Sequence, residues 1–193
     1  MMGDSKAYCP AMFLDRDGVI IENRENYVRA WDEVSVLPRS MAALRRLAGM
    51  PFKVFIVTNQ SAVGRGLVAR PTVEDINARL VRKIERAGGR IDGIYMCPHA
   101  PEMACRCRKP EPGLLLEAAA DHDIDLGRSF LIGDAASDIL AGRSAGIGHL
   151  ILVRTGRGRS QESLLKQLGL GATLCYDSLH AAISAIARDA SAC

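Results

Sequence analysis

The stretch that decides the fold reads Phe13-Leu14-Asp15-Arg16-Asp17-Gly18. It closes an apolar run, Ala11 to Leu14, with the length and continuity of a buried parallel strand. In open α/β sheets, ligands bind beyond the carboxyl ends of the strands, where Asp15 and Asp17 would lie. Two carboxylates that face one crevice repel each other unless a cation lies between them. The stretch therefore predicts a Mg²⁺ site, although Asp and Gly are also ordinary turn residues.

The composition is that of a globular protein, with 193 residues, 48% of them hydrophobic and 24% charged. This length suits a single domain, 1–193, with a core over about residues 9–188 and a polar tail over 1–8. We expect no membrane span, because no apolar stretch approaches the necessary length. The net charge of +3 makes a nucleic-acid partner improbable. The polar start lacks the apolar centre of a signal peptide, so we expect a cytoplasmic protein.

Apolar runs alternate with helical patterns along the chain. The expected strands span residues 11–14, 53–57, 91–96, 130–132 and 150–153, with a short one near Leu174. The expected helices include 39–49, one that Thr72 caps and Gly88-Gly89 ends, 112–122 and 137–145. Such alternation implies right-handed crossovers, and hence an α/β fold with a doubly wound parallel sheet. The segments between strands are too short for a large cap domain.

Polar side chains follow three of these strands. Asp15 and Asp17 follow the first, Thr58-Asn59 the second, and the pair Asp134 and Asp138 the fourth. Lys109 lies between the second and third of these groups. Phosphoryl transfer needs in-line geometry and neutralised phosphoryl oxygens, and a carboxylate can attack phosphorus to form an acyl phosphate.

The chemistry of each residue type suggests a separate role for it in phosphoryl transfer. Asp15 and Asp134 would hold Mg²⁺, which prefers oxygen ligands and keeps a substrate phosphate in its shell. Thr58 and Lys109 would hold the other phosphoryl oxygens. Asp17 would protonate the leaving oxygen and later deprotonate the attacking water.

A second metal site is predicted in the loop before Lys109. Cys97, His99, Cys105 and Cys107 offer three thiolates and one imidazole, a set that suits tetrahedral structural Zn²⁺. A disulfide is disfavoured, because the expected compartment is reducing and a bridge across so few residues would be strained. Four protein ligands leave no open position for catalysis, so the metal would shape the loop that carries Arg108 and Lys109. We expect ordinary core or surface thiols at Cys9, Cys175 and Cys193.

These motifs resemble those of the haloacid dehalogenase-like phosphatases, whose fold is Rossmann-type. The matching stretches are Asp15-Arg16-Asp17-Gly18, Thr58-Asn59-Gln60, Lys109, and Gly133-Asp134 with Asp138. The resemblance implies that Asp15 is the nucleophile and Asp17 the general acid and base. It also implies that Asp15, Asp134 and the backbone carbonyl of Asp17 ligate Mg²⁺, while Asp138 orients a metal-bound water.

The narrower resemblance, over about Met12 to Gly156, is to heptose 1,7-bisphosphate and histidinol-phosphate phosphatases. It rests on Val57-Thr58-Asn59-Gln60-Ser61, Arg65-Gly66, Cys97-Pro98-His99, Cys105-Arg106-Cys107-Arg108-Lys109-Pro110 and Val153-Arg154-Thr155-Gly156. It implies that Thr58, Asn59, Arg65, Arg108 and Lys109 bind substrate. Two positions depart from the pattern: Ala135 stands where relatives commonly carry Lys or Arg, and Ile21 where heptose enzymes often carry Asn. Both are expected to flank the substrate entrance.

The predicted function is hydrolysis of the C7 phosphate of D-glycero-D-manno-heptose 1,7-bisphosphate, with an aspartyl-phosphate intermediate and Mg²⁺ and Zn²⁺ as cofactors. We expect a monomer that acts on a small phosphorylated metabolite. Histidinol phosphate is the alternative substrate, and a non-catalytic zinc-containing binding protein is the alternative of another class. Arg154, Arg157 and Arg159 are expected to face solvent, because they lie in a glycine-rich loop.

Overall fold

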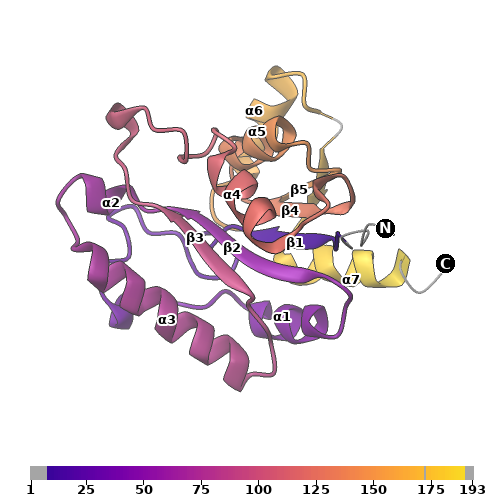
Figure 1. Ribbon diagram of the computed structural model, residues 1–193, viewed down its shortest axis with the longest axis horizontal. Helices are drawn as coiled ribbons and strands as arrows, with labels where there is room; N and C mark the ends of the chain where they lie inside the picture. Colours follow the sequence, from indigo (N-terminus) through magenta and orange to yellow (C-terminus); the bar gives the residue numbers. More distant parts are fainter. Residues whose placement is uncertain (1–7, 172, 190–193) are drawn as a thin grey trace, which may run out of the picture.

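The computed structural model describes residues 8–171 and 173–189. A six-stranded sheet in the order β3-β2-β1-β4-β5-β6 forms its centre (Figure 1). Every pairing of neighbouring strands is parallel. The strands are β1 (Ala11–Leu14), β2 (Lys53–Asn59), β3 (Gly93–Cys97), β4 (Phe130–Gly133), β5 (His149–Val153) and β6 (Leu174–Tyr176). The predicted parallel α/β sheet is confirmed, while residues 1–7 of the expected polar tail and Cys193 lie outside the described residues.

Helices cover both faces of the sheet, as a doubly wound fold requires (Figure 1). Buried residues of α1, α3 and α7 pack on one face, and those of α4, α5 and α6 on the other. Strand β1 shows the alternation, because Met12 and Leu14 join the first cluster and Ala11 and Phe13 the second. The helices are α1 (Ser40–Ala48), α2 (Ser61–Gly64), α3 (Arg70–Arg86), α4 (Gly113–His122), α5 (Ala136–Ala145), α6 (Gly158–Gln167) and α7 (Leu179–Asp189). Within the described ranges, no helix has the length and apolarity needed to cross a membrane.

Several boundaries differ from the sequence-based expectation. Helix α3 begins at Arg70 with Ala69 as its N-cap, so the predicted cap at Thr72 is wrong. Pro71 lies in the first turn, where its missing N–H and fixed φ are tolerated. Strand β2 continues through Thr58 and Asn59, which were expected to follow it. The short helix α2 and the 3₁₀ helices η1 (Trp31–Glu33), η2 (Pro101–Met103) and η3 (Leu126–Arg128) were not predicted.

The carboxyl ends of β1, β2 and β4 lie side by side at the centre of the sheet. Leu14, the last residue of β1, is in register with Ile56 of β2 and Ile132 of β4. The segment after β1 folds back on itself through hydrogen bonds such as Gly18 N–H to the Ile21 oxygen, at 2.7 Å. Ile21 is fully buried in the core, so the expectation that it flanks the substrate entrance is wrong. Short loops and one-turn helices, rather than a large cap domain, border this edge in the described chain.

Candidate active site

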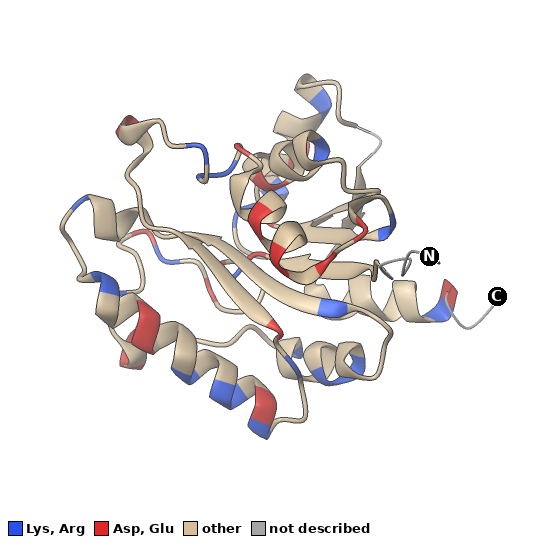
Figure 2. Cartoon of the chain, in the orientation of Figure 1, with Lys and Arg blue, Asp and Glu red and all other residues tan. Residues whose placement is uncertain are grey.

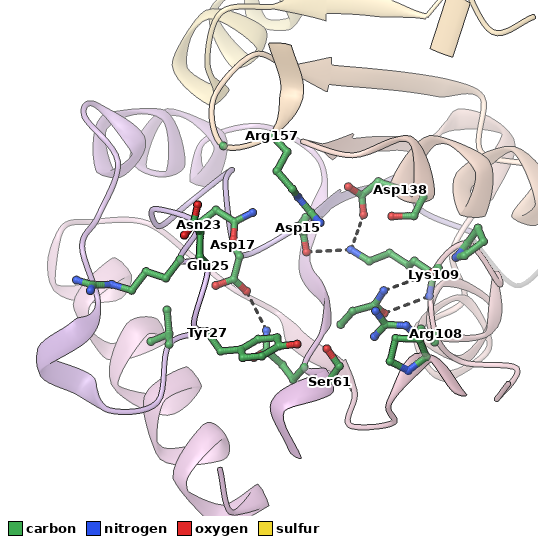
Figure 3. A pocket seen from close by; sticks show the side chains of 18 of the residues that line it. Asp15, Asp17, Asn23, Glu25, Tyr27, Ser61, Arg108, Lys109, Asp138 and Arg157 are labelled. Carbon is green, nitrogen blue, oxygen red and sulfur yellow. Dashed lines mark hydrogen bonds and ion pairs between the residues drawn. The ribbon is translucent and has the colours of Figure 1, made fainter. Parts of the chain in front are cut away.

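Three carboxylates and one ammonium group meet at the carboxyl edge of the sheet, and Figure 3 shows the contacts of Lys109 with two of them, Asp15 and Asp138. Oxygens of Asp15, Asp134 and Asp138 all lie within 4.8 Å of one another. Lys109 Nζ lies 2.9 Å from Asp15 Oδ1 and 2.6 Å from Asp138 Oδ1. All four side chains are buried. The fold thus brings together acids that the sequence places after different strands.

The electrostatics of this group favour an added cation. Burial raises the pKa of Asp15 to about 7; Lys109 opposes this shift, and the neighbouring carboxylates add to it. Burial also raises the pKa of Asp134. Burial lowers the pKa of Lys109, but Asp138 and Asp15 raise it more, so the ammonium form is retained. Clustered buried carboxylates form a donor set that fits Mg²⁺, which is a hard cation with oxygen ligands.

We expect Mg²⁺ to stabilise the fold more at pH 8 than at pH 6. The pKa of Asp15 is raised from 3.8 to about 7, so the metal-free folded protein keeps this proton and loses stability as the pH rises through 7. At pH 6 a cation must displace the proton, whereas at pH 8 the carboxylate is already ionised. Thermal unfolding with and without MgCl₂ at each pH measures the effect, and Asp15→Asn should remove much of the difference. An equal or larger Mg²⁺-induced shift at pH 6 would contradict this prediction.

Asp17 is oriented by a buried arginine. Arg16 is 1% exposed and donates from Nε and Nη2 to the two Asp17 oxygens, both at 3.1 Å. Its Nη1 donates to Asn77 Oδ1 of α3 at 2.7 Å. Gln60 Nε2 donates to Asp17 Oδ2 at 2.9 Å. The sequence analysis assigned no role to Arg16 or Asn77. An asparagine beside Ile76 on the apolar face of α3 did indicate a buried polar contact, because a buried amide needs a hydrogen-bond partner.

Thr58 and Asn59 are placed at the site in different ways. Thr58 Oγ1 accepts a hydrogen bond from Gln60 Nε2 at 2.8 Å, so its own hydrogen can be donated to another acceptor. Asn59 Nδ2 donates to the Lys109 carbonyl at 3.0 Å, and Lys109 N–H donates to Asn59 Oδ1 at 3.1 Å. The amide of Asn59 therefore fixes the backbone of Lys109.

A cavity of about 750 Å³ opens over the acidic group (Figure 3). Its buried floor includes Asp15 and Lys109. Arg65 and Arg108, the predicted substrate-binding arginines, also line it. Arg65 Nη2 lies 3.3 Å from Glu102 Oε1 of the cysteine-rich loop, and both side chains are exposed. The remaining lining residues include Asp17, Asn23, Arg24, Glu25, Tyr27, Asn59, Gln60, Ser61, Asp138, Gly156 and Arg157.

The three arginines that follow β5 differ in their contacts, and the last of them, Arg159, lies in the first turn of α6 rather than in a loop. Arg157 lines the cavity and contacts Asp134, so the expectation that it only faces solvent is wrong. Arg154 is ion-paired with Glu162 at 2.8 Å and Asp177 at 3.1 Å. Arg159 is exposed, as expected. These differences depend on contacts between distant segments, and spacing within the loop gives no sign of them.

The predicted zinc ligands converge. Adjacent ligand atoms of Cys97, His99, Cys105 and Cys107 lie 3.3–3.6 Å apart. A tetrahedron with Zn–S and Zn–N bonds of ordinary length has edges of about 3.5–3.8 Å, so these atoms fit around one ion with little movement. The sulfurs are too far apart for disulfide bonds, and all three cysteines are free thiols. Cys9 and Cys175 are half-buried free thiols, and neither is a member of this cluster.

This combination of sheet, acidic pairs, hydroxyl and lysine defines the class of haloacid dehalogenase-like hydrolases. A family model described as HAD-hydrolase-like matches residues 106–182. The chain is 39% identical over 168 residues to D-glycero-β-D-manno-heptose-1,7-bisphosphate 7-phosphatase of Bordetella bronchiseptica, covering 86% of this chain and 92% of the relative. It is 37% identical over 175 residues to the enzyme of that name in Pseudomonas aeruginosa, covering 91% and 96%.

A solved structure gives the same result. The crystal structure of D,D-heptose 1,7-bisphosphate phosphatase from B. bronchiseptica, complexed with magnesium and phosphate, matches with a TM-score of 0.86 and 36% identity. The match covers 93% of this chain and 99% of that one. The chain belongs to the family of D-glycero-β-D-manno-heptose-1,7-bisphosphate 7-phosphatases. The resemblance inferred from the motifs is thereby confirmed.

Proposed function

We propose that this chain is a Mg²⁺-dependent phosphomonoesterase that removes the C7 phosphate of D-glycero-β-D-manno-heptose 1,7-bisphosphate. One observation carries the proposal: Lys109 Nζ bridges Asp15 and Asp138 on the buried floor of a cavity, with Asp134 beside them. This arrangement presents a carboxylate nucleophile while neutralising part of the surrounding negative charge. The family of the relatives supports the substrate assignment.

The first chemical step belongs to Asp15. Its carboxylate oxygen attacks phosphorus as the bond to the C7 oxygen breaks, which leaves an aspartyl phosphate. Asp17, held by Arg16 and Gln60, protonates the departing C7 oxygen. In the second step Asp17 takes a proton from water, whose oxygen attacks phosphorus and releases Asp15. Thr58 donates its free hydrogen to a phosphoryl oxygen.

Residues of this chain also provide for the metal. Asp15, Asp134 and the backbone carbonyl of Asp17 would hold Mg²⁺, and Asp138 would orient one of its waters. When bound, Mg²⁺ supplies positive charge that lowers the repulsion between the carboxylate nucleophile and the phosphate. Lys109 holds the nucleophile from the other side and contacts the phosphate.

The second phosphate of the substrate requires a cationic contact outside the reaction centre. Arg65 and Arg108 line the cavity away from its buried floor, and we assign the C1 phosphate to them. An acidic surface there would suit histidinol phosphate better, because its imidazole end is cationic at mildly acidic pH. The basic lining therefore favours the bisphosphate.

A comparison of substrates tests this assignment. With Mg²⁺, we expect kcat/KM for the heptose bisphosphate to exceed that for histidinol phosphate by at least about tenfold, as an additional charge-assisted contact would give. Phosphorus NMR of the product should show that the C1 phosphate remains. A preference for histidinol phosphate, or loss of the C1 phosphate first, would contradict the proposal.

We also propose that Cys97, His99, Cys105 and Cys107 hold a structural Zn²⁺ that fixes the loop leading to Arg108 and Lys109. Cys105→Ser should lower bound zinc per chain and reduce kcat by about tenfold or more, because a loosened loop misplaces Lys109. Metal analysis and steady-state kinetics measure the two effects. Cys175→Ser is the matched control, since this thiol lies outside the cluster. Full zinc content in Cys105→Ser would rule out this ligand set.

Single-domain organisation over 1–193, a monomeric state and a cytoplasmic location are part of the same proposal. Figure 2 shows acidic and basic segments interspersed along α3. With a net charge of +3, such mixing gives little support to a nucleic-acid partner. The complete set of acids, hydroxyl and lysine also speaks against a non-catalytic zinc protein. Light scattering coupled to gel filtration tests the monomeric state.

A further inference from the structure

The loop after β5 encloses Asp134 from one side. Asp134 is 0% exposed, and its Oδ2 accepts the backbone N–H of Arg157 at 2.9 Å. A Cβ atom added to Gly18 or Gly156 would lie 2.1 or 2.3 Å from the same Oδ2. Both glycines also have positive φ, at +82° and +56°. Oδ2 is therefore committed to the loop, and Oδ1 is the oxygen that remains for another partner.

The side chain of Arg157 contacts the remaining oxygen of Asp134, Oδ1. Its Nη2 lies 3.4 Å from Asp134 Oδ1, while the side chain as a whole is 57% exposed and lines the cavity. Figure 3 shows it extending from the β5 loop toward Asp15 and Asp138. Lys109, which is buried, forms ion pairs with those other two carboxylates. The acidic group thus has one fixed cation and one that can move away into the cavity.

The residue after Asp134 carries no charge of its own. Ala135 provides no charge, so the second cation of the site comes from a different loop. With the three carboxylates ionised, Lys109 and Arg157 leave the group with one net negative charge. A divalent cation reverses that sign, and the reversed charge repels Arg157 and attracts a phosphate.

Building on the function proposed above, we propose that Arg157 is an exchangeable cation. It occupies Asp134 Oδ1 when the metal is absent, gives up that oxygen to Mg²⁺, and then binds the phosphate of the substrate. Arg157 would therefore weaken Mg²⁺ binding and strengthen phosphate binding. A residue that acted only through packing, and not through its charge, would not affect the two ligands in opposite directions.

Calorimetry of Arg157→Ala tests the exchange without turnover. We expect Mg²⁺ alone to bind about three- to fivefold more tightly than to the unaltered protein, because a partly exposed competing ion pair is gone. We expect inorganic phosphate to bind the Mg²⁺-loaded variant about tenfold more weakly. The hydrogen bond from the Arg157 backbone N–H to Asp134 Oδ2 does not involve the side chain and remains in this variant, so the carboxylate stays in place. Arg157→Lys should retain most of the phosphate affinity, and Arg159→Ala, two residues away and exposed, should change neither constant.

The possible results separate this inference from the function on which it rests. Unchanged or weaker Mg²⁺ binding in Arg157→Ala would overturn the exchange, and so would unchanged phosphate binding. Either result, with normal binding in the unaltered chain, leaves the proposed phosphatase intact. If the unaltered chain binds neither Mg²⁺ nor phosphate, the proposed function fails and the exchange fails with it.

Discussion

Asp15→Asn is expected to abolish phosphatase turnover while leaving the fold intact, with kcat reduced by at least about 10⁴-fold. An amide has almost the shape of the carboxylate but cannot attack phosphorus to form the acyl phosphate. The fold should not suffer, because burial already raises the pKa of Asp15 toward the neutral form. The metal-free variant should unfold at the same temperature as the unaltered protein or higher. Steady-state kinetics and thermal unfolding provide both measurements.

Asp75→Asn is a suitable control, since this acid makes an exposed i,i+4 ion pair on α3 with Arg79. It should retain full activity. Asparagine can deamidate, so intact mass must be checked before any residual turnover is assigned to the variant. An Asp15→Asn protein of the correct mass that keeps more than a few per cent of kcat would remove Asp15 from its assigned role.

Lys109→Met is expected to damage stability as well as catalysis. It removes the only cation in contact with Asp15 and Asp138 among the described residues, and both acids are buried. Breaking a buried pair from one side costs about 3–5 kcal/mol, because the remaining charges lose their partner. We expect kcat to fall by about 10²–10³-fold, since a positive charge beside the nucleophile and phosphate is lost. Urea unfolding in the absence of metal measures the change in stability.

Two further observations distinguish this effect from simple loss of packing. Mg²⁺ should stabilise Lys109→Met more than the unaltered protein, because it supplies the missing positive charge. Lowering the pH should also restore stability, since the unpaired carboxylates become protonated. Lys166→Met, at an exposed position on α6, should be neutral. A Lys109→Met protein as stable as the unaltered chain at pH 8 without metal would contradict this account.

The parts of the site that could be predicted are those that lie next to a strong local pattern. Asp15, Thr58 and Asp134 each lie at or just beyond the end of an apolar run, and parallel strands bring such ends to one edge. The four predicted zinc ligands lie within one short loop, so their spacing alone indicated that they could share an ion, and their ligand atoms do lie together. The fold and the meeting of these acids at one edge of the sheet therefore followed from short-range information, whereas the role of Asp15 as nucleophile came from the family resemblance and stays a prediction.

The parts that could not be predicted depend on contacts between distant segments. Arg16 and Asn77 are 61 positions apart and meet only because α3 packs beside the loop after β1. Arg157 and Asp134 are 23 positions apart and are joined through the loop after β5. The local pattern of a glycine-rich loop predicts solvent exposure, and nothing within that loop indicates the carboxylate it meets. Both contacts depend on how distant segments pack against each other, and the residue types within either segment do not indicate them.

The most direct test of the central claim is to trap phosphate on Asp15. Acetyl phosphate with Mg²⁺ is a suitable donor for the Asp17→Asn variant, because its leaving group needs no general acid and the missing base slows hydrolysis of the intermediate. Borohydride reduces an aspartyl phosphate to homoserine, which peptide mass mapping can locate. We predict homoserine at position 15 only when both donor and Mg²⁺ are present. Homoserine at another carboxylate, or none at position 15 while acetyl phosphate is being consumed, would contradict the account.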